Sequence, residues 1–386
     1  MIMNTILLKN AKVVLPEAEA QVSIFISDGV IAEIFSENKD CPADLSFDAS
    51  NLRIFAGFID IHNHGAVGFD VNEAEKDDLI AIGKFLALNG VTAWLPTFVP
   101  DTDENYLKVV GEINEVLEIQ ADLPIAQIVG VHYEGVFANE KMCGALRPAY
   151  FKTFKNKSEI SELPKLENGV HFTTLAPEIE NGIELIAELV KQNWIVSIGH
   201  TKAEVETLER AKKAGAKHLT HFFNAMTGVH HRETGVAGWG LNAKDVTFDI
   251  IADGVHVAPE MLKLVCEIKS PEMVSLISDS VAPTGLGDGS FEIWGEKISV
   301  IEGKTKNERG SIAGSVITLR DAVKNMLSLG FTNAEVSQMA SANSAKLLGI
   351  ENNYGTIEVG KRADLAAIDE NENVKFVIIN GKLIQN

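Results

Sequence analysis

The chain has 386 residues and a formal net charge of −20 at pH 7, because 54 acidic residues outnumber 34 basic ones. A surface of that charge repels nucleic acid and anionic membranes, and it repels anionic small molecules unless a local cationic pocket attracts them. With 46% hydrophobic residues, no apolar run long enough to span a membrane and three widely spaced cysteines, the composition indicates a globular cytoplasmic protein without a disulfide framework.

Both ends of the chain have the pattern of short β-strands separated by turns. The first fifty residues alternate between apolar and polar positions and contain an Asp28-Gly29 turn, and the last thirty contain an Asn380-Gly381 turn. Because the two ends share this pattern and the middle does not, we expect residues 1–54 and 351–386 to pair into one small β-sandwich domain.

Between residues 55 and 350, short apolar runs alternate with helical segments, which predicts an α/β protein with a (β/α)8 TIM-like barrel. The eight predicted strands are "GFIDIHNH", "GVTAWLPTF", "IVGVHYEG", "VHFTTLAPE", "WIVSIGHT", "HLTHFFNAM", "VTFDIIADGVH" and "VSLISDS". Helical segments such as "AEVETLERAKKAG" end on glycine, as a helix C-cap does. The stretch "GLGDGS" at residues 285–290 is expected to be a flexible loop after the eighth strand, without the lysine of a phosphate-binding loop.

Polar side chains gather at the C-terminal ends of these apolar runs. They are His62, His64, Thr97, Glu134, Thr174, His200, His221, Asp253, His256 and Asp279. The C-terminal ends of the strands of a parallel barrel meet at one mouth, where the active sites of this fold are found. We therefore expect a functional site at that mouth.

The histidines and Glu134 have the composition of a metal site. His62 and His64 are two residues apart on a predicted strand, so both point to one face, about 6–7 Å apart, and can bind one cation. Glu134, His200 and His221 complete a nitrogen and oxygen shell suited to zinc, iron, manganese or cobalt. A single histidine of this kind is usually a packed, hydrogen-bonded imidazole, but the number of such residues at strand ends favours a metal centre.

Asp279 follows the eighth predicted strand, opposite the candidate ligands. A carboxylate beside a divalent cation stays ionised, accepts a proton from water and passes it to a leaving group. Ser-Asp-Ser is also common turn chemistry, so a turn role is the alternative. The position of Asp279 favours the catalytic role.

The ordered motifs of the chain resemble the amidohydrolase superfamily, and within it the family of N-acetylglucosamine-6-phosphate deacetylases, over nearly the full length. These motifs are "HNHG", "HYEG", "TLAPE", "GHT", "HFFNAM", "HHRETGVAG", "IADGVHV", "ISDSVAPTG" and "GTIEVGKRADL". The resemblance implies hydrolysis of the N-acetyl group of an amino sugar phosphate to release acetate. It also implies a homodimer and one or two divalent cations per subunit, with zinc favoured.

The resemblance implies a role for individual residues. Glu134, His200 and His221 would hold the principal metal, His62 and His64 match family members that take a second one, and Asp279 would be the general base and acid. Substrate-binding positions, some of them reaching across a dimer interface, would be Asn224, Ala225, Arg232, His256 and Gly314. Arg232 and His256 would supply the local positive charge that a sugar phosphate requires.

Leu146 departs from the pattern of the family. At this spacing after Glu134, relatives have a histidine or glutamine that donates a hydrogen bond to the substrate carbonyl, and losing such a donor costs on the order of 100- to 1000-fold in rate. We favour a second metal at His62 and His64 as the replacement, because this pair and the missing donor occur together. Arg147 as the donor, or another substrate such as N-acetylgalactosamine-6-phosphate or unphosphorylated N-acetylglucosamine, are the alternatives. Cys143, in the same stretch, is expected to be an ordinary loop residue.

Two other classes of function stay open. A deaminase or cyclic-amide hydrolase uses a similar barrel, but "HFFNAM" followed by "HHRETG" matches the sugar-phosphate deacetylases. A non-catalytic sugar-phosphate sensor is supported by Leu146 alone, and the intact candidate metal set with Asp279 opposes it.

Overall fold

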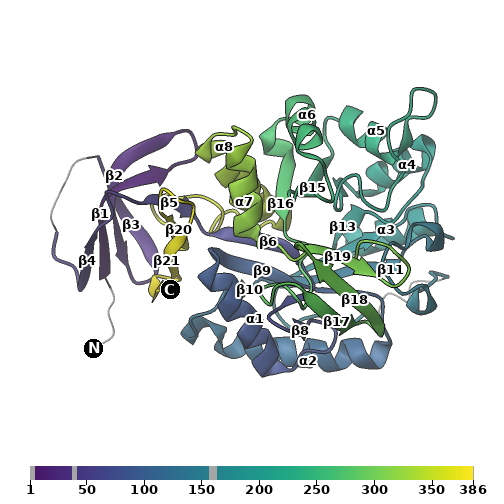
Figure 1. Ribbon diagram of the computed structural model, residues 1–386, viewed down its shortest axis with the longest axis horizontal. Helices are drawn as coiled ribbons and strands as arrows, with labels where there is room; N and C mark the ends of the chain where they lie inside the picture. The colour runs from purple at the N-terminus through teal and green to yellow at the C-terminus, as the bar shows by residue number, and fades with distance from the viewer. Residues whose placement is uncertain (1–4, 37–40, 156–162, 386) are drawn as a thin grey trace.

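The computed structural model of the protein describes residues 5–36, 41–155 and 163–385. A small β domain, built from both ends of the chain, lies beside a larger barrel of parallel strands surrounded by helices (Figure 1). Both parts of the predicted fold are therefore confirmed. No helix among the described residues is long and apolar enough to cross a membrane.

The β domain is a sheet in which the strands from the C-terminal end of the chain lie beside those from the N-terminal end. Its strands are β1 (Thr5–Val14), β2 (Glu19–Ser27), β3 (Val30–Phe35), β4 (Leu45–Asp48), β5 (Arg53–Ala56), β20 (Leu365–Ile368), β21 (Val374–Ile379) and β22 (Lys382–Gln385). The order is β22-β21-β20-β5-β1-β2-β3, with β4 also paired to β1. The Asp28-Gly29 and Asn380-Gly381 turns form as expected, with positive φ at all four residues. The domain boundaries at residues 54 and 350 stay a prediction.

All eight predicted barrel strands form, in the predicted order. They are β6 (Phe58–Asn63), β9 (Val91–Phe98), β11 (Gly130–Phe137), β12 (Val170–Leu175), β13 (Ile195–Ile198), β14 (His218–Leu219), β15 (Thr247–Ile251) and β16 (Val274–Ile277), and the short β10 (Gln127–Ile128) also pairs with β9. The barrel closes between β6 and the segment after β16. There the His62 carbonyl accepts from Asp279 N at 3.0 Å and the Ser280 carbonyl accepts from His64 N at 2.8 Å.

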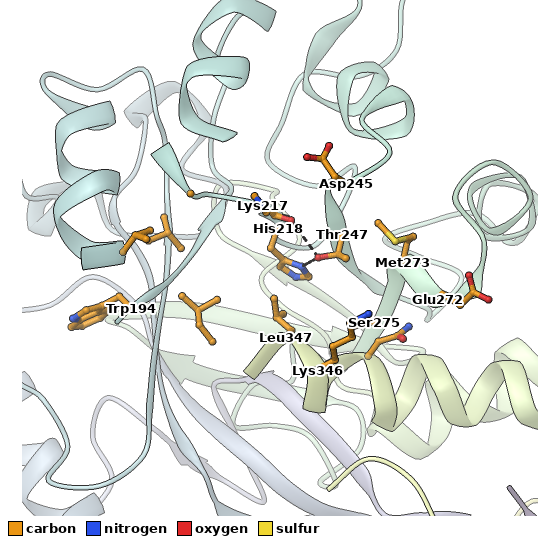
Figure 2. A pocket seen from close by; sticks show the side chains of 15 residues that line it. Trp194, Lys217, His218, Asp245, Thr247, Glu272, Met273, Ser275, Lys346 and Leu347 are labelled. Atoms are coloured by element: carbon orange, nitrogen blue, oxygen red, sulfur yellow. Dashed lines mark hydrogen bonds between the residues drawn. The ribbon is translucent and has the colours of Figure 1, made fainter. Parts of the chain in front are cut away.

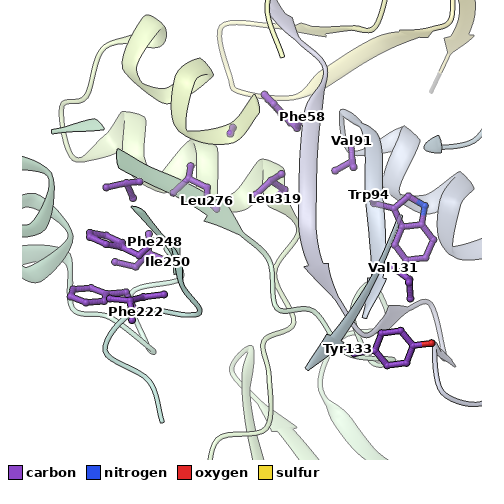
Figure 3. Packing of buried hydrophobic residues seen from close by; sticks show 14 of the residues in the cluster. Phe58, Val91, Trp94, Val131, Tyr133, Phe222, Phe248, Ile250, Leu276 and Leu319 are labelled. Atoms are coloured by element: carbon purple, nitrogen blue, oxygen red, sulfur yellow. The ribbon is translucent and has the colours of Figure 1, made fainter. Parts of the chain in front are cut away.

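Helices cover the outside of the barrel. They are α1 (Lys76–Leu88), α2 (Asp103–Ile119), α3 (Gly182–Lys191), α4 (Val205–Ala214), α5 (Gly235–Asn242), α6 (Pro259–Lys269), α7 (Leu319–Ser328), α8 (Asn333–Ser337) and α9 (Asn343–Leu348), with a π-helical turn (Gln338–Ala342) before α9. Helix α4 ends at Gly215, whose φ of +116° confirms the predicted glycine cap. Outward-facing strand residues such as Trp94 and Phe248 pack in the layer between strands and helices (Figure 3).

A register shift in β6 controls which of its side chains enter the barrel. Ile59 and Ile61 belong to the apolar cluster that fills the barrel interior. Pairing of β6 with β9 then shifts between Asp60 and Asn63. Because a bulge re-aims the side chains that follow it, His62 and His64 also face the interior, directly after the apolar positions.

The segment after β16 is a folded insert. We expected a flexible loop at residues 285–290, and this is wrong for its end, because Gly289 begins an antiparallel sheet of β17 (Gly289–Ile293), β18 (Glu296–Ile301) and β19 (Lys304–Asn307). The signal was present in the sequence. Trp294-Gly295 and Glu302-Gly303 are two-residue turns with positive φ between alternating strands.

Candidate metal centre

Glu134, His200 and His221 form one compact group at the C-terminal mouth of the barrel. Glu134 comes from β11, whereas His200 and His221 follow β13 and β14. The two imidazole Nε2 atoms are 3.0 Å apart. Glu134 Oε1 lies 3.1 Å from His200 Nε2 and 2.9 Å from His221 Nε2.

His62, His64 and Asp279 form a second group beside the first. The Nε2 atoms of the two histidines are 3.1 Å apart, and they lie 3.4 Å and 3.3 Å from Asp279 Oδ1. Glu134 joins the groups, because its Oε1 is 3.3 Å from His62 Nε2 and its Oε2 is 3.3 Å from His64 Nε2. The structure therefore brings together all six predicted residues.

The chemistry of these side chains fits divalent cations. In each group the three ligand atoms lie within 4.8 Å of one another, and ligand atoms about 2.1 Å from a tetrahedral Zn²⁺ are about 3.4 Å apart. The backbone carbonyls of Thr97 and Met142 accept from Nδ1 of His64 and His200, at 3.0 Å and 2.8 Å. A carbonyl only accepts, so each Nδ1 carries a proton and each Nε2 is the nitrogen that faces the centre, where a cation would replace any proton on it.

The electrostatics keep both carboxylates ionised. Burial alone raises the pKa of Glu134 and Asp279, but the neighbouring imidazoles, His62 foremost, hold the pKa of Glu134 well below its usual value and lower that of Asp279. Burial likewise opposes the charged form of His64, yet hydrogen bonds to Asp279 and Glu134 raise its pKa to about 10. The centre thus presents negative oxygens that attract positive charge.

The backbone is strained at three of these residues. His200, His221 and Asp279 have φ of +48°, +33° and +49°. This left-handed region costs a residue with a β-carbon about 1–2 kcal/mol. Such strain persists where the surrounding structure imposes it, and it concentrates at functional sites. Each of the three stands just beyond a strand end, where the turn aims its side chain across the barrel mouth.

A pocket of about 330 Å³ opens above the two candidate metal-binding groups. Of the predicted substrate-binding residues, it is lined by Leu146, Asn224, Ala225, His256 and Gly314. The His256 ring is oriented by a hydrogen bond between its Nδ1 and Asp253 Oδ2, which are 2.6 Å apart. Its Nε2 is the nitrogen left for another partner.

Two predicted substrate-binding residues are not brought to this pocket. The Arg147 guanidinium donates to the Pro100 carbonyl and to Asp101 Oδ2, both at 2.8 Å, and lies over the Tyr150 ring. Arg232 is exposed, and its Nη1 lies 2.8 Å from His231 Nε2. Arg147 is therefore occupied as a structural cation, and Arg232 does not line the pocket of its own chain.

The folded insert contributes a pocket residue that the sequence did not reveal. Trp294, at the turn between β17 and β18, lines the pocket, and its ring lies 5.5 Å from that of His64 in an edge-to-face arrangement. Leu146 packs in the same apolar cluster as Trp294 and Ile293. Leu146 thus anchors its loop to the insert. Cys143 packs against the cluster as well and belongs to neither metal-binding group.

The comparisons with known proteins agree with this geometry. A model of the amidohydrolase family matches residues 53–384. This chain belongs to the amidohydrolase family. The amidohydrolase is 35% identical to an N-acetylgalactosamine-6-phosphate deacetylase of Escherichia coli O157:H7, over 93% of each chain. It is 33% identical to an N-acetylglucosamine-6-phosphate deacetylase of Bacillus subtilis, over 93% of this chain and 91% of that protein.

A solved structure extends the likeness to three dimensions. The crystal structure of an N-acetylglucosamine-6-phosphate deacetylase from Thermotoga maritima superimposes with a TM-score of 0.88 at 32% identity. The match covers 98% of this amidohydrolase and all of that chain. The predicted family is confirmed, with the β domain included in the match.

Proposed function

We propose that this amidohydrolase removes the N-acetyl group of an amino sugar phosphate, with N-acetylglucosamine-6-phosphate as the leading substrate, to give acetate and glucosamine-6-phosphate. The observation that carries the proposal is the convergence on one pocket of two candidate metal-binding groups, one of which includes Asp279. The full-length likeness to deacetylases of two hexosamine-6-phosphates supports it. Neither a deaminase nor a sugar sensor has comparable support.

The metal would be held by the side chains described above. Glu134, His200 and His221 would hold the principal cation, and His62 and His64 a second one beside Asp279. When bound, a divalent cation lowers the pKa of water and polarises a carbonyl oxygen. A nitrogen-rich ligand set favours zinc, with iron, manganese and cobalt as the alternatives.

Asp279 would move the proton. Its ionised Oδ1 accepts a proton from the attacking water as the oxygen bonds to the acetyl carbon, and it then donates that proton to the sugar nitrogen as the C–N bond breaks. The amide and one water thereby become acetic acid and an amine, which ionise to acetate and an ammonium group. His256, fixed through Nδ1 by Asp253, would present Nε2 to a sugar hydroxyl.

Leu146 supports the use of two cations. It lines the pocket at the position from which relatives would donate to the carbonyl, and its side chain has no donor. Arg147 is paired with Asp101. With Arg147 paired elsewhere, a second cation at His62 and His64 is the replacement that we favour.

The phosphate would be bound across a homodimer. No lysine or arginine is among the residues that line the pocket in the described chain, so a dianionic phosphate requires a cation from elsewhere. Arg232 is exposed on the loop before α5 and is the candidate, reaching the pocket of the partner subunit. The homodimer and a cytoplasmic location stay predictions.

The deciding experiment measures acetate released from N-acetylglucosamine-6-phosphate, N-acetylgalactosamine-6-phosphate and unphosphorylated N-acetylglucosamine. Enzyme loaded with zinc, iron, manganese or cobalt, and enzyme treated with a chelator, are compared. We expect acetate from N-acetylglucosamine-6-phosphate that disappears on chelation and returns with metal. A higher kcat/KM for N-acetylgalactosamine-6-phosphate would establish the second candidate, which the 35% identical relative favours. Absence of acetate from all three would refute the deacetylase function.

A further inference from the structure

A chain of hydrogen bonds runs through the barrel from its N-terminal end to His221. A cavity of about 390 Å³ opens at that end, and His218 and Thr247 line it (Figure 2). The Thr247 hydroxyl lies 2.7 Å from His218 Nδ1 (Figure 2). On the other side of the ring, His218 Nε2 lies 3.0 Å from Asp249 Oδ2. The other carboxylate oxygen, Asp249 Oδ1, accepts from the His221 backbone N–H at 2.5 Å.

The His218–Asp249 pair is buried and has partners on both sides. Each residue is 1% exposed. Desolvating such a pair is so costly that apolar residues of similar volume often stabilise a core as well or better. A contribution to the stability of the barrel therefore does not explain why an imidazole and a carboxylate are buried here.

The His221 ring has less direct support than the rings of His64 and His200. Among the described residues its Nδ1 is buried without a hydrogen-bond partner, whereas Nδ1 of His64 and of His200 binds a backbone carbonyl. The orientation of the His221 ring therefore depends on its backbone, whose φ of +33° is strained. The contact that holds this backbone N–H is the one with Asp249.

We propose that Asp249 is a positioning residue that holds the His221 backbone in the left-handed conformation which aims Nε2 at the metal, and that His218 fixes the Asp249 carboxylate for this purpose. Asp249 and His218 are absent from the lining of the substrate pocket. The inference rests on the proposed metal site. Removing a partner that supports a ligand in this way typically lowers metal affinity by about 10- to 100-fold.

The test compares Asp249→Ala with Asp249→Asn in zinc-loaded enzyme. The amide oxygen of the asparagine still accepts from the His221 N–H, whereas alanine cannot. We expect Asp249→Ala to lose zinc to a chromogenic chelator at least about tenfold faster than the wild type, and Asp249→Asn to stay within about threefold. With cobalt in place of zinc, the visible absorption spectrum should change in the alanine variant and be preserved in the asparagine variant.

Ser341→Ala is the matched control. It removes a fully buried hydroxyl that donates to the Gly57 carbonyl at 2.5 Å, away from the metal-binding groups, so it lowers stability without changing zinc release. If Asp249→Ala does not fold, the Thr247→Val variant tests the proposal instead. Thr247 is half-buried beside the cavity, and its hydroxyl bonds His218. We expect this variant to release zinc at least about threefold faster than the wild type. Zinc release equal to that of the control would overturn the positioning role. A wild type that binds no metal would instead refute the proposed metal site.

Discussion

Asp279 stands where a carboxylate can both face a cation and move a proton. Its Oδ1 is within 3.4 Å of the imidazoles of His62 and His64, which keep it ionised. Its φ of +49° and the hydrogen bond from its N–H to the His62 carbonyl fix it to the neighbouring strand. The carboxylate is thus pre-positioned in the pocket rather than free to rotate into solvent.

Replacing Asp279 by Asn should lower kcat by about 100- to 10,000-fold, because the amide cannot take up and return the proton. Acetate release from N-acetylglucosamine-6-phosphate measures the effect. The control is Asp101→Asn, a carboxylate on the same rim that pairs with Arg147 outside the pocket. A drop of less than tenfold for Asp279→Asn would assign the proton transfer to another group.

Arg147 differs from Asp279 because its partners lie outside the pocket. Arg147→Ala should leave kcat/KM within about threefold of the wild type and lower the free energy of unfolding by about 1 kcal/mol, through loss of the ion pair and the contact with Tyr150. Chemical denaturation and acetate release measure the two effects. A hundredfold loss of kcat at unchanged stability would show instead that Arg147 is the carbonyl donor.

At the scale of the elements, strand β6 positions the two histidines of the second candidate metal-binding group, and the insert packs beside them. The register shift in β6 turns His62 and His64 inward. The insert of β17 to β19 places Trp294 against His64 and packs on Leu146. The element that covers the pocket therefore uses Leu146 as an apolar anchor, which explains why a leucine suits this position structurally.

His62→Gln should reduce the metal content from two ions per subunit to one and lower kcat at least about 100-fold, because Leu146 leaves the carbonyl without another donor. Metal analysis of the purified enzyme, together with acetate release, measures both effects. Adding Leu146→Gln to this variant restores the side-chain donor and should recover part of the lost rate. A fully active wild type with one ion per subunit would contradict the expectation.

At the scale of the whole molecule, the described part of the chain brings candidate metal ligands and Asp279 to the pocket but no lysine or arginine that could bind a phosphate there. A cation for the phosphate matters in this protein, because a surface with a net charge of −20 repels anions. The proposed homodimer, in which the exposed Arg232 would reach the other subunit, would supply the missing cation.

Mixing inactive Asp279→Asn subunits with inactive Arg232→Ala subunits tests this arrangement. After random exchange, half of the dimers are mixed, and one site in each combines an intact Asp279 with an intact Arg232 from the partner. We expect about one quarter of the wild-type activity to return, as acetate release. No recovery after demonstrated subunit exchange would show that Arg232 acts within its own chain or not at all.

Much of the architecture could be predicted from the sequence because it depends on local patterns. Alternating apolar runs, glycine caps and two-residue turns such as Asn380-Gly381 predicted the β domain and the eight barrel strands. The fold rule that all strand ends meet at one mouth then predicted that Glu134, His200, His221 and Asp279 would converge. The structure confirms their convergence, while their catalytic and metal-binding roles stay proposals.

Only the tertiary structure decided what depends on neighbours distant in sequence. It assigned Arg147 to Asp101, brought Trp294 to the pocket and linked Asp249 to the His221 backbone. The Trp294-Gly295 and Glu302-Gly303 turns indicate the insert. No sequence pattern, however, specifies which carboxylate will accept a hydrogen bond from a buried N–H. Periodicity determines which face a side chain occupies, whereas packing between strands determines what that side chain contacts.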